Sequence, residues 1–206
     1  MKMLDIPSAV QILKKGGIIA YPTETFYGLG CDATNFAAIQ KIFELKGRDE
    51  KNPLPVLIDS VEKLPLYVRE IPLFAEKLIQ KFWPGPLTLV FWAKEGCFPE
   101  ELLAGTQKIA LRISSHPLAQ KLTKGFGLPL TTTSANRAGE IPARSAEELK
   151  KYFSNIDGVV EGGELLPSKG STILDVTCKS PKVLREGDIL KIELQKYTPS
   201  PLQGEG

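Results

Sequence analysis

The sequence predicts an α/β fold built on a mixed sheet. Apolar strand-like segments alternate with amphipathic helical segments along most of the chain, which is typical of α/β proteins. Toward the middle and end, short strands follow one another without full-length helices between them, so we expect a mixed rather than a purely parallel sheet. The 206 residues, of which 42% are hydrophobic, suit one domain with a sizeable core. We expect this domain to span residues 1–195, and the Pro- and Gly-containing segment 196–206 to form a flexible tail.

Helical spacing and capping signals place the helices. Residues 8–15, 72–83 and 117–124 have amphipathic patterns, and Pro84-Gly-Pro86 follows the second of them. Asn35 is placed to cap a helix whose apolar residues from Ala38 to Phe43 share one face. Ser145-Ala-Glu-Glu148 matches a capping box, which predicts a helix from there to about Tyr152.

Runs of apolar and β-branched residues predict the strands. The predicted strands cover residues 18–21, 55–58, 87–92, 109–113, 128–132, 171–176 and 183–184. The segment 189–194 is apolar at a spacing that fits either a strand or a helix, and the sequence does not decide between them.

Composition and charge exclude several classes of protein. The net charge is only +2, so any anion binding must come from local clustering of cations. No apolar run reaches the roughly 18 residues of a membrane span, and the N-terminus has no apolar signal-peptide core. The three cysteines are far apart and form no C-x-x-C pair, which predicts neither a disulfide framework nor a structural zinc site. We therefore expect a reduced, cytoplasmic setting.

The segment 17–57 carries the densest set of candidate ligand groups. An apolar strand leads into Thr23-Glu24-Thr25, a position at which α/β folds commonly place ligand groups, although these hydroxyls also suit an ordinary turn. Residues 28–33 fit the dinucleotide pattern G-x-G-x-x-A, but residues 22–27 separate them from the strand. We therefore interpret Gly28 and Gly30 as glycines of a tight turn.

Two pairs of cations are candidate anion ligands. Lys46-Gly-Arg48 ends a predicted helix, where the cations either stabilise the helix dipole or bind phosphate or carboxylate. Lys108 and Arg112 lie four apart on a predicted strand, so both take one face, which either lines a site or is solvated.

The sequence lacks the signatures of nucleophilic and metal catalysis. His116, the single histidine, precedes Pro117 and is interpreted as a turn or helix-start residue. There is no G-x-S-x-G elbow, no P-loop and no histidine cluster, so we assign no catalytic residue and no metal ligand. A site rich in donors and cations favours a reaction driven by positioning and charge neutralisation, such as phosphoryl or nucleotidyl transfer.

Seven motifs, in order and spacing, closely resemble the YrdC/Sua5 family between residues ~8 and ~190. They are Pro22-Thr-Glu-Thr25, Gly28-Leu-Gly30, Lys46-Gly-Arg48, Trp83-Pro-Gly-Pro-Leu-Thr-Leu89, Ser134-Ala-Asn136, Ser171-Thr-Ile-Leu-Asp175 and Leu184-Arg-Glu-Gly187. The resemblance implies a twisted, mainly parallel α/β sheet around a positively charged cavity. The implied activity is that of an L-threonylcarbamoyladenylate synthase, a nucleotidyltransferase that begins the making of N6-threonylcarbamoyladenosine in tRNA.

The resemblance also implies substrates, cofactor and site residues. ATP, L-threonine and bicarbonate would give threonylcarbamoyl-AMP and pyrophosphate, with Mg²⁺ accompanying ATP. The product would pass to the tRNA threonylcarbamoyl transferase complex. The residues implied to bind threonine are Arg112, Thr25, Thr132 and Ser171. The residues implied to bind ATP are Lys46, Arg48, Asn52, Lys108, Ser134, Asn136, Pro142 and Arg185.

Two features differ from some members of the family. Leu57 takes a position at which some relatives carry a histidine near threonine. The chain also has no counterpart of the extra C-terminal domain of longer relatives, so we expect the short form.

The competing hypothesis is a non-catalytic protein of the YciO type that binds double-stranded RNA or tRNA. Such a protein needs a broad basic surface, which the net charge of +2 does not indicate.

Overall fold

The computed structural model describes residues 1–47, 49, 52–137, 139–199 and 203–204. The helices are α1 (Ile6–Lys14), α2 (Phe36–Lys46), η1 (Val61–Lys63), α3 (Leu64–Tyr67), α4 (Leu73–Phe82), α5 (Glu100–Leu103), α6 (Pro117–Phe126), α7 (Ala146–Tyr152), α8 (Lys191–Leu194) and η2 (Gln195–Tyr197). The strands are β1 (Met3–Leu4), β2 (Ile19–Pro22), β3 (Tyr27–Gly30), β4 (Val56–Leu57), β5 (Leu87–Trp92), β6 (Lys108–Arg112), β7 (Leu130–Thr131), β8 (Thr133–Ser134), β9 (Gly158–Val160), β10 (Thr172–Asp175), β11 (Lys182–Arg185) and β12 (Gln203–Gly204).

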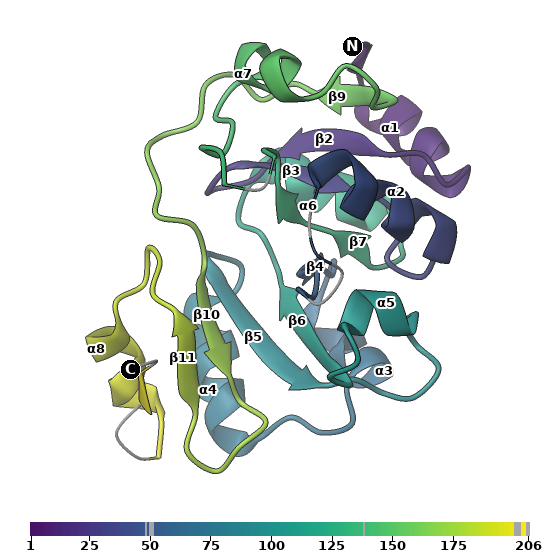
Figure 1. Cartoon of the computed structure of the whole chain (residues 1–206). Helices are drawn as coiled ribbons and strands as arrows, with labels where there is room; N and C mark the ends of the chain where they lie inside the picture. Colours follow the sequence, from purple (N-terminus) through teal and green to yellow (C-terminus); the bar gives the residue numbers. More distant parts are fainter. Residues whose placement is uncertain (48, 50–51, 138, 200–202, 205–206) are drawn as a thin grey trace.

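The strands form two mixed sheets, one above the other in Figure 1. The upper sheet has five strands in the order β1-β9-β2-β3-β8, and the lower sheet has seven in the order β12-β11-β10-β5-β6-β4-β7. Parallel and antiparallel pairs alternate along the lower sheet. The α/β class and the mixed pairing are confirmed. The strands divide over two sheets rather than one, and parallel pairs do not predominate.

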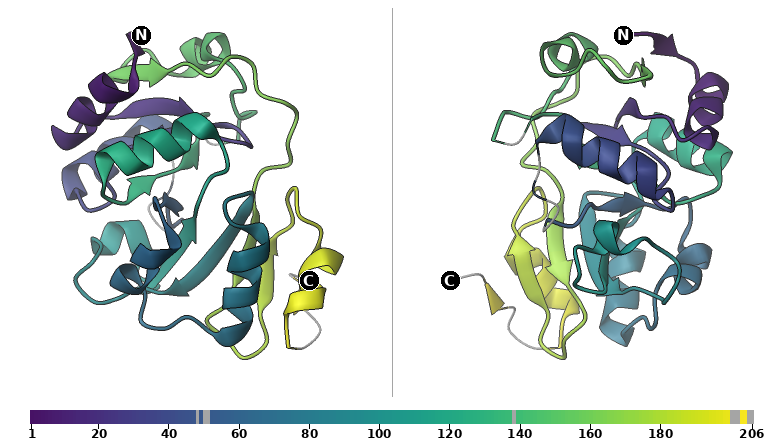
Figure 2. Two further views of the ribbon diagram at one scale, coloured as in Figure 1. Left: turned by 180° about the vertical axis from the view of Figure 1, so that it is seen from behind. Right: turned by 45° about the vertical axis from the view of Figure 1, so that its right-hand side comes forward.

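Helices pack on both faces of the upper sheet, with α1 and α6 on one face and α2 on the other, and on one face of the lower sheet. Helices α1 and α6 pack together over β2 through a buried apolar cluster that includes Leu13, Ile19 and Leu122. Helix α4 lies against the far face of the lower sheet, which is visible from behind in Figure 2. Its Leu78 and Ile79 join the larger cluster with Leu89 and Leu174 of that sheet. The opposite face of β5, β6 and β10 is left for a site.

The helix predictions are confirmed, and the caps explain where the helices begin. The Asn35 side chain accepts a hydrogen bond from the Ala38 backbone N–H at 3.1 Å, which starts α2. The Ser145 hydroxyl accepts from the Glu148 N–H at 3.2 Å, which starts α7. The Glu148 carboxylate, however, accepts from the Arg144 N–H at 2.7 Å, one residue earlier than a capping box requires. The undecided segment 189–194 contains the short helix α8.

The prediction of a tight turn at Gly28 and Gly30 is wrong. Both glycines lie in strand β3, which pairs antiparallel with β2. The reason for glycine is close approach, because a Cβ on Gly30 would come within 2.5 Å of Cε1 of the Tyr21 ring. Tyr21 is fully buried beneath this strand, and its hydroxyl donates to the Thr131 carbonyl at 2.8 Å. A strand whose residues are all buried shows no period-two pattern, which explains why the sequence did not predict it.

The remaining predictions about chain organisation have different outcomes. Cys31, Cys97 and Cys178 are all free, as expected. Within the described residues, no helix is both long enough and apolar enough to cross a membrane. Near the end of the chain, the Tyr197 ring packs edge-on against Phe82 at 5.5 Å, and β12 pairs with β11. The division into a domain of residues 1–195 and a flexible tail stays a prediction.

Candidate ligand-binding site between the two sheets

A cavity of about 710 Å³ opens between the two sheets. Its wall combines the hairpin of β2 and β3, the exposed face of β5, β6 and β10, strand β8, and the loops before β4 and β10. The lining residues that carry polar or charged side chains are Thr23, Thr25, Tyr27, Thr88, Thr106, Lys108, Arg112, Thr132, Thr133, Ser134, Lys169, Ser171, Asp175 and Arg185. A volume of this size is in the range of sites that hold a nucleotide-sized ligand.

Strand alternation explains how β6 serves both the cavity and the core. Lys108, Ala110 and Arg112 line the cavity, whereas Ile109 and Leu111 are buried in the large apolar cluster on the other face. The predicted placement of Lys108 and Arg112 on one face is therefore confirmed, and that face lines a site.

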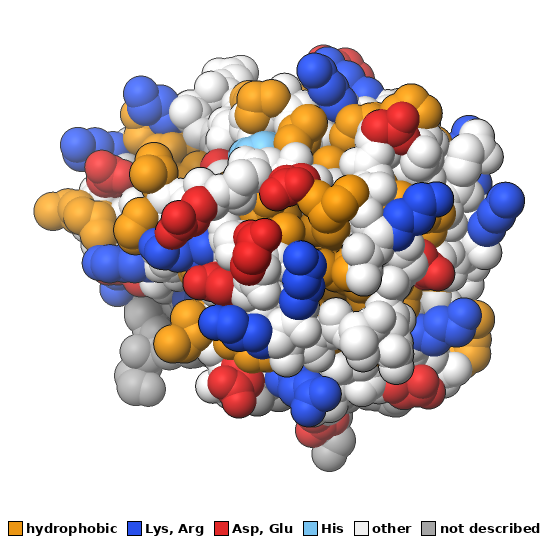
Figure 3. Space-filling model, turned by 90° about the horizontal axis from the view of Figure 1, so that it is seen from above, with side chains coloured by type: hydrophobic (Ala, Val, Ile, Leu, Met, Phe, Trp, Pro, Cys, Tyr) orange, Lys and Arg blue, Asp and Glu red, His pale blue; other side chains and the backbone are white. Residues whose placement is uncertain are grey.

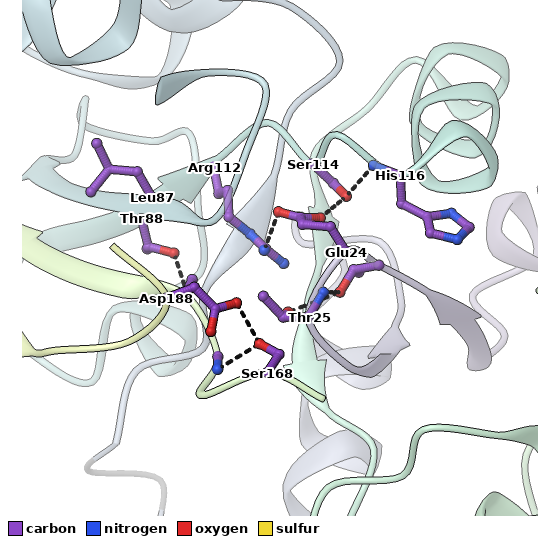
Figure 4. A network of polar contacts seen from close by, with 12 residues as sticks. Glu24, Thr25, Leu87, Thr88, Arg112, Ser114, His116, Ser168 and Asp188 are labelled. Carbon is purple, nitrogen blue, oxygen red and sulfur yellow. Dashed lines mark hydrogen bonds and ion pairs between the residues drawn. The ribbon is translucent and has the colours of Figure 1, made fainter. Parts of the chain in front are cut away.

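Arg112 lies at the deep end of β6 and is paired with Glu24. Its Nη1 donates to Glu24 Oε1 at 2.7 Å, and the two side chains are only 4% and 15% exposed. The second carboxylate oxygen of Glu24 accepts a hydrogen bond from the Ser114 hydroxyl. The Arg112 Nε is buried and has no hydrogen-bond partner among the described residues. Figure 4 shows Glu24 between Arg112 on one side and Ser114 on the other.

Lys108 lies at the other end of β6 and is paired with Asp175. Its Nζ lies 2.8 Å from Asp175 Oδ2 and 4.9 Å from the centre of the Trp92 ring. Burial raises the pKa of the Asp175 carboxyl, but hydrogen bonds from Lys108 and Thr177 outweigh it, so the pKa lies below its usual value. Lys108 is 26% exposed, so this ion pair lies near the rim of the cavity.

The Ser171 side chain is hydrogen-bonded to Thr88 of β5 and to Arg185 of β11. The Thr88 hydroxyl donates to Ser171 Oγ at 2.9 Å. Arg185 Nη2 donates to the Ser171 carbonyl at 2.7 Å and to Ser171 Oγ at 3.1 Å. Gly170, immediately before, has a φ of +87°, a left-handed conformation that favours glycine. The loop thereby presents a hydroxyl and a guanidinium together in the cavity wall.

The loop 134–136 is held from behind by Lys46. Lys46 is buried, and its Nζ donates to the Asn136 carbonyl at 2.7 Å and to the Ser134 carbonyl. The Ser134 hydroxyl donates to Asn136 Oδ1 at 2.7 Å. Ser134 lines the cavity, whereas Lys46 and Asn136 support the loop that carries it. Lys46 of the Lys46-Gly-Arg48 motif thus contacts the Ser134-Ala-Asn136 motif directly.

Most of the residues implied by the resemblance meet at this cavity. The implied residues in the lining are Thr25, Lys108, Arg112, Thr132, Ser134, Pro142, Ser171 and Arg185. Lys46, Asn52 and Asn136 are not in the lining, and Arg48 lies outside the described residues. Leu57 is fully buried in the apolar cluster beneath α1 and α6, so its side chain packs in the core rather than at the cavity.

Sequence reasoning missed Thr88, Ser114 and Asp175. Alternation along residues 87–92 could have indicated Thr88, because Leu87 and Leu89 take the core face. Ser114 follows β6 and gave no local signal, since its role depends on Glu24, 90 residues away. His116 caps α6, with its Nδ1 accepting from the Leu118 N–H at 3.2 Å, which confirms the helix-start interpretation.

The described residues contain no group of three or more His, Cys, Asp or Glu side chains that could hold a metal ion.

Comparison with known proteins decides the family. Residues 11–187 match the family model Sua5_yciO_yrdC, described as telomere recombination. The chain belongs to the Sua5/YciO/YrdC family. A curated relative from Thiobacillus denitrificans, named threonylcarbamoyl-AMP synthase, is 36% identical over 87% of this chain and 94% of its own length. A protein of the same name from Pyrococcus abyssi is 38% identical over 91% of this chain.

Solved structures of the Sua5/YciO/YrdC family share the fold. Pyrococcus abyssi Sua5, solved in complex with L-threonine, superposes with a TM-score of 0.92 at 34% identity and covers 99% of this chain and 61% of that one. Escherichia coli YciO superposes with a TM-score of 0.80 at 30% identity and covers 88% of each chain. The chain spans just over half the length of the Pyrococcus abyssi and Bacillus subtilis synthases, 55% and 56%.

Proposed function

We propose that this protein is a threonylcarbamoyl-AMP synthase, which makes threonylcarbamoyl-AMP and pyrophosphate from L-threonine, bicarbonate and ATP. The observation that carries the proposal is one cavity that gathers a carboxylate-binding arginine, further cations and several hydroxyls. Pyrococcus abyssi Sua5, which superposes on this chain with a TM-score of 0.92, was solved in complex with L-threonine. The members named threonylcarbamoyl-AMP synthase at 36–39% identity further favour this activity.

The amino acid would lie at the deep end of β6. Arg112 is the buried cation there, and the planar fork of a guanidinium matches a carboxylate. The hydroxyls of Thr25, Thr132 and Ser171 line the same cavity and offer partners for the amine and the side-chain hydroxyl of threonine. This arrangement would hold threonine by its carboxylate and leave its amine free to react.

ATP would lie toward the rim. Lys108 and Arg185 supply positive charge for its phosphates, and Ser134 supplies a hydroxyl from the loop that Lys46 holds. Pro142 lines the same side of the cavity and offers an apolar surface. When bound, Mg²⁺ would neutralise charge on the phosphates of ATP and on the departing pyrophosphate.

The reaction then needs two bond-forming steps. The neutral amine of threonine attacks the carbon of carbon dioxide, which bicarbonate supplies, and loses a proton to give a carbamate. A carbamate oxygen attacks the α-phosphorus of ATP, and the bond from that phosphorus to the bridging oxygen breaks, so pyrophosphate leaves. The cavity offers positioning and charge neutralisation rather than a nucleophile, which is sufficient for this class of transfer.

Two partners complete the proposal. The product would pass to the tRNA threonylcarbamoyl transferase complex. Direct binding of tRNA or double-stranded RNA, if it occurs, would be weak, because binding without sequence preference needs clustered cations. On the face shown in Figure 3, basic and acidic side chains are interspersed and form no continuous basic stripe.

The test is release of pyrophosphate by the purified protein with ATP and Mg²⁺. We expect release to require both L-threonine and bicarbonate, with threonylcarbamoyl-AMP identified by mass spectrometry. Omitting each substrate in turn provides the control. The proposal is wrong if no product forms while the Pyrococcus abyssi relative makes it under the same conditions.

A further inference from the structure

Glu24 is half-buried, with a side chain that is 15% exposed, and it is not among the residues that line the cavity. Arg112 belongs to the lining, whereas its partner Glu24 does not. Each carboxylate oxygen has its own donor: Oε1 accepts from Arg112 and Oε2 accepts from Ser114. Ser114 is in turn fixed, because its Oγ accepts from the His116 N–H at 3.2 Å at the start of α6. We call Glu24 and Ser114 the brace.

The brace addresses a physical problem of this site. An arginine has a long flexible side chain, and a buried guanidinium without a counter-charge is costly. The brace neutralises the charge and uses only the Nη1 donor of Arg112 in the described part of the chain. A guanidinium has five N–H donors, so the contact with Glu24 uses only one of them while it holds the side chain. The side chain is 4% exposed, which leaves little room for another rotamer.

We propose that Glu24, held by Ser114, is the positioning residue that aims Arg112 at the carboxylate of the amino-acid substrate. This inference rests on the proposed function, because it assigns the substrate carboxylate to Arg112. Glu24 acts through Arg112 and touches no reacting atom. A role as the base that accepts the proton of the amine is disfavoured by the geometry, since both carboxylate oxygens already accept hydrogen bonds and neither lies in the wall.

The experiment measures binding of L-threonine and of ATP by calorimetry to the full chain and three variants. Glu24→Ala removes the brace, and threonine should bind about 10- to 100-fold more weakly, as expected for loss of a well-placed hydrogen bond between charged groups. Glu24→Gln removes the counter-charge but keeps an oxygen for Arg112 and an amide that can donate to Ser114, so threonine affinity should fall clearly less than in Glu24→Ala. Ser114→Ala should weaken threonine binding by about threefold, the effect of one neutral hydrogen bond. ATP affinity should change by less than about twofold in all three, because the brace contacts no group of the rim.

A matched control is available in the same chain. Asp59 forms an ion pair of the same 2.7 Å length with Lys63, its side chain is 16% exposed against 15% for Glu24, and it does not line the cavity. Asp59→Asn should leave both affinities unchanged. L-threoninamide, which lacks the carboxylate, is a second control, because it tests whether the effect of Glu24→Ala depends on the substrate carboxylate. It should bind the wild type and Glu24→Ala equally well, because only the carboxylate depends on the aim of Arg112.

The outcomes separate this inference from the proposed function. Equal loss of threonine and ATP affinity in Glu24→Ala, or equal loss in Glu24→Gln and Glu24→Ala, would overturn the positioning role. If Glu24→Ala does not fold, an unchanged threonine affinity in Ser114→Ala overturns it instead. A wild type that binds no threonine and makes no threonylcarbamoyl-AMP would refute the proposed function. A wild type that does both, with brace variants that behave like it, would refute only the inference.

Discussion

Strand β6 carries an ion pair at each end, and the two pairs differ in burial far more than in length. Arg112–Glu24 and Lys108–Asp175 are 2.7 Å and 2.8 Å long, but the cations are 4% and 26% exposed. In a less polar environment an ion pair is stronger and more rigid, whereas near water it is weakened by screening. One strand therefore supplies a fixed cation at depth and a releasable cation at the rim. A small carboxylate suits the first, and a larger polyanion suits the second.

The most direct way to break this comparison is Arg112→Lys. Lysine keeps the charge but loses the planar fork, so the dissociation constant for threonine should rise about 10- to 100-fold. The dissociation constant for ATP should rise far less. Calorimetry with each substrate measures both constants. Arg144→Lys is the control, because Arg144 also pairs with a carboxylate, Glu164 at 3.2 Å, but does not line the cavity.

Lys108→Ala should have the opposite effect to Arg112→Lys, weakening ATP binding more than threonine binding. Loss of a partly exposed cation should weaken ATP binding by about tenfold and threonine binding by much less. The control is Lys63→Ala, which removes another lysine paired with an aspartate, outside the cavity. The affinity for ATP should also fall more steeply with added salt than the affinity for threonine. If Arg112→Lys and Lys108→Ala affect both substrates equally, the division between deep end and rim is refuted.

The variant Asp175→Asn tests the Lys108–Asp175 ion pair at the rim, because the contribution of this pair to stability should depend on pH. The pKa of Asp175 is lowered in the folded protein, so its carboxylate stabilises the fold above the ordinary value of 3.8. That contribution is lost as the pH falls through the lower pKa of the folded state. At neutral pH the wild type should therefore be more stable than the variant, by about 1 kcal/mol or less because Lys108 is partly exposed to solvent.

The same melting comparison carried below pH 3.8 provides the check. The difference in stability between the wild type and Asp175→Asn should decrease there, because the wild-type carboxyl becomes protonated and is then neutral like the amide of the variant. A gap that stayed constant with pH would mean that Asp175 stabilises the fold by packing rather than by its charge.

The smallest effect on activity is expected from His116→Ala. Burial lowers the pKa of His116 and the charge of Glu24 opposes this, with a net decrease, so the ring is neutral at neutral pH and its Nδ1 accepts from α6. Losing this cap should cost about 0.5–2 kcal/mol of stability. Turnover with all substrates should stay close to wild type. A large loss of turnover without loss of stability would indicate a base at the deep end.

Local patterns in the sequence predicted much of this molecule. The helix α2 followed from its Asn35 cap and one apolar face, and β5 has the predicted bounds. Alternation along β6 predicted that Lys108 and Arg112 share one face, although it did not decide that this face lines a site. In each case the deciding signal lies within a few residues, because caps and side-chain periodicity depend on near neighbours.

The features that escaped prediction depend on distant residues. Gly30 of β3 is explained by the ring of Tyr21 and the backbone of Thr131, which no spacing in the sequence reveals. The partner of Arg112 is 88 residues away at Glu24, and the partner of Lys108 is 67 residues away at Asp175. The resemblance to a family named the residues of the cavity but not these pairs. How the strands divide between two sheets is likewise set by long-range pairing, such as β1 with β9.

The order in which the wall is built along the chain has a consequence for synthesis. The residues of the wall run from Thr23 to Arg185, and β10 and β11 contribute Asp175 and Arg185 near the end. Even the first strand, β1, must wait for Val159 and Val160 before it can pair. A chain emerging from the ribosome can form early helices but neither sheet in full, because non-local pairing closes late. The ability to bind substrate should thus appear abruptly, once translation has passed Arg185, and can serve as a readout of completed folding.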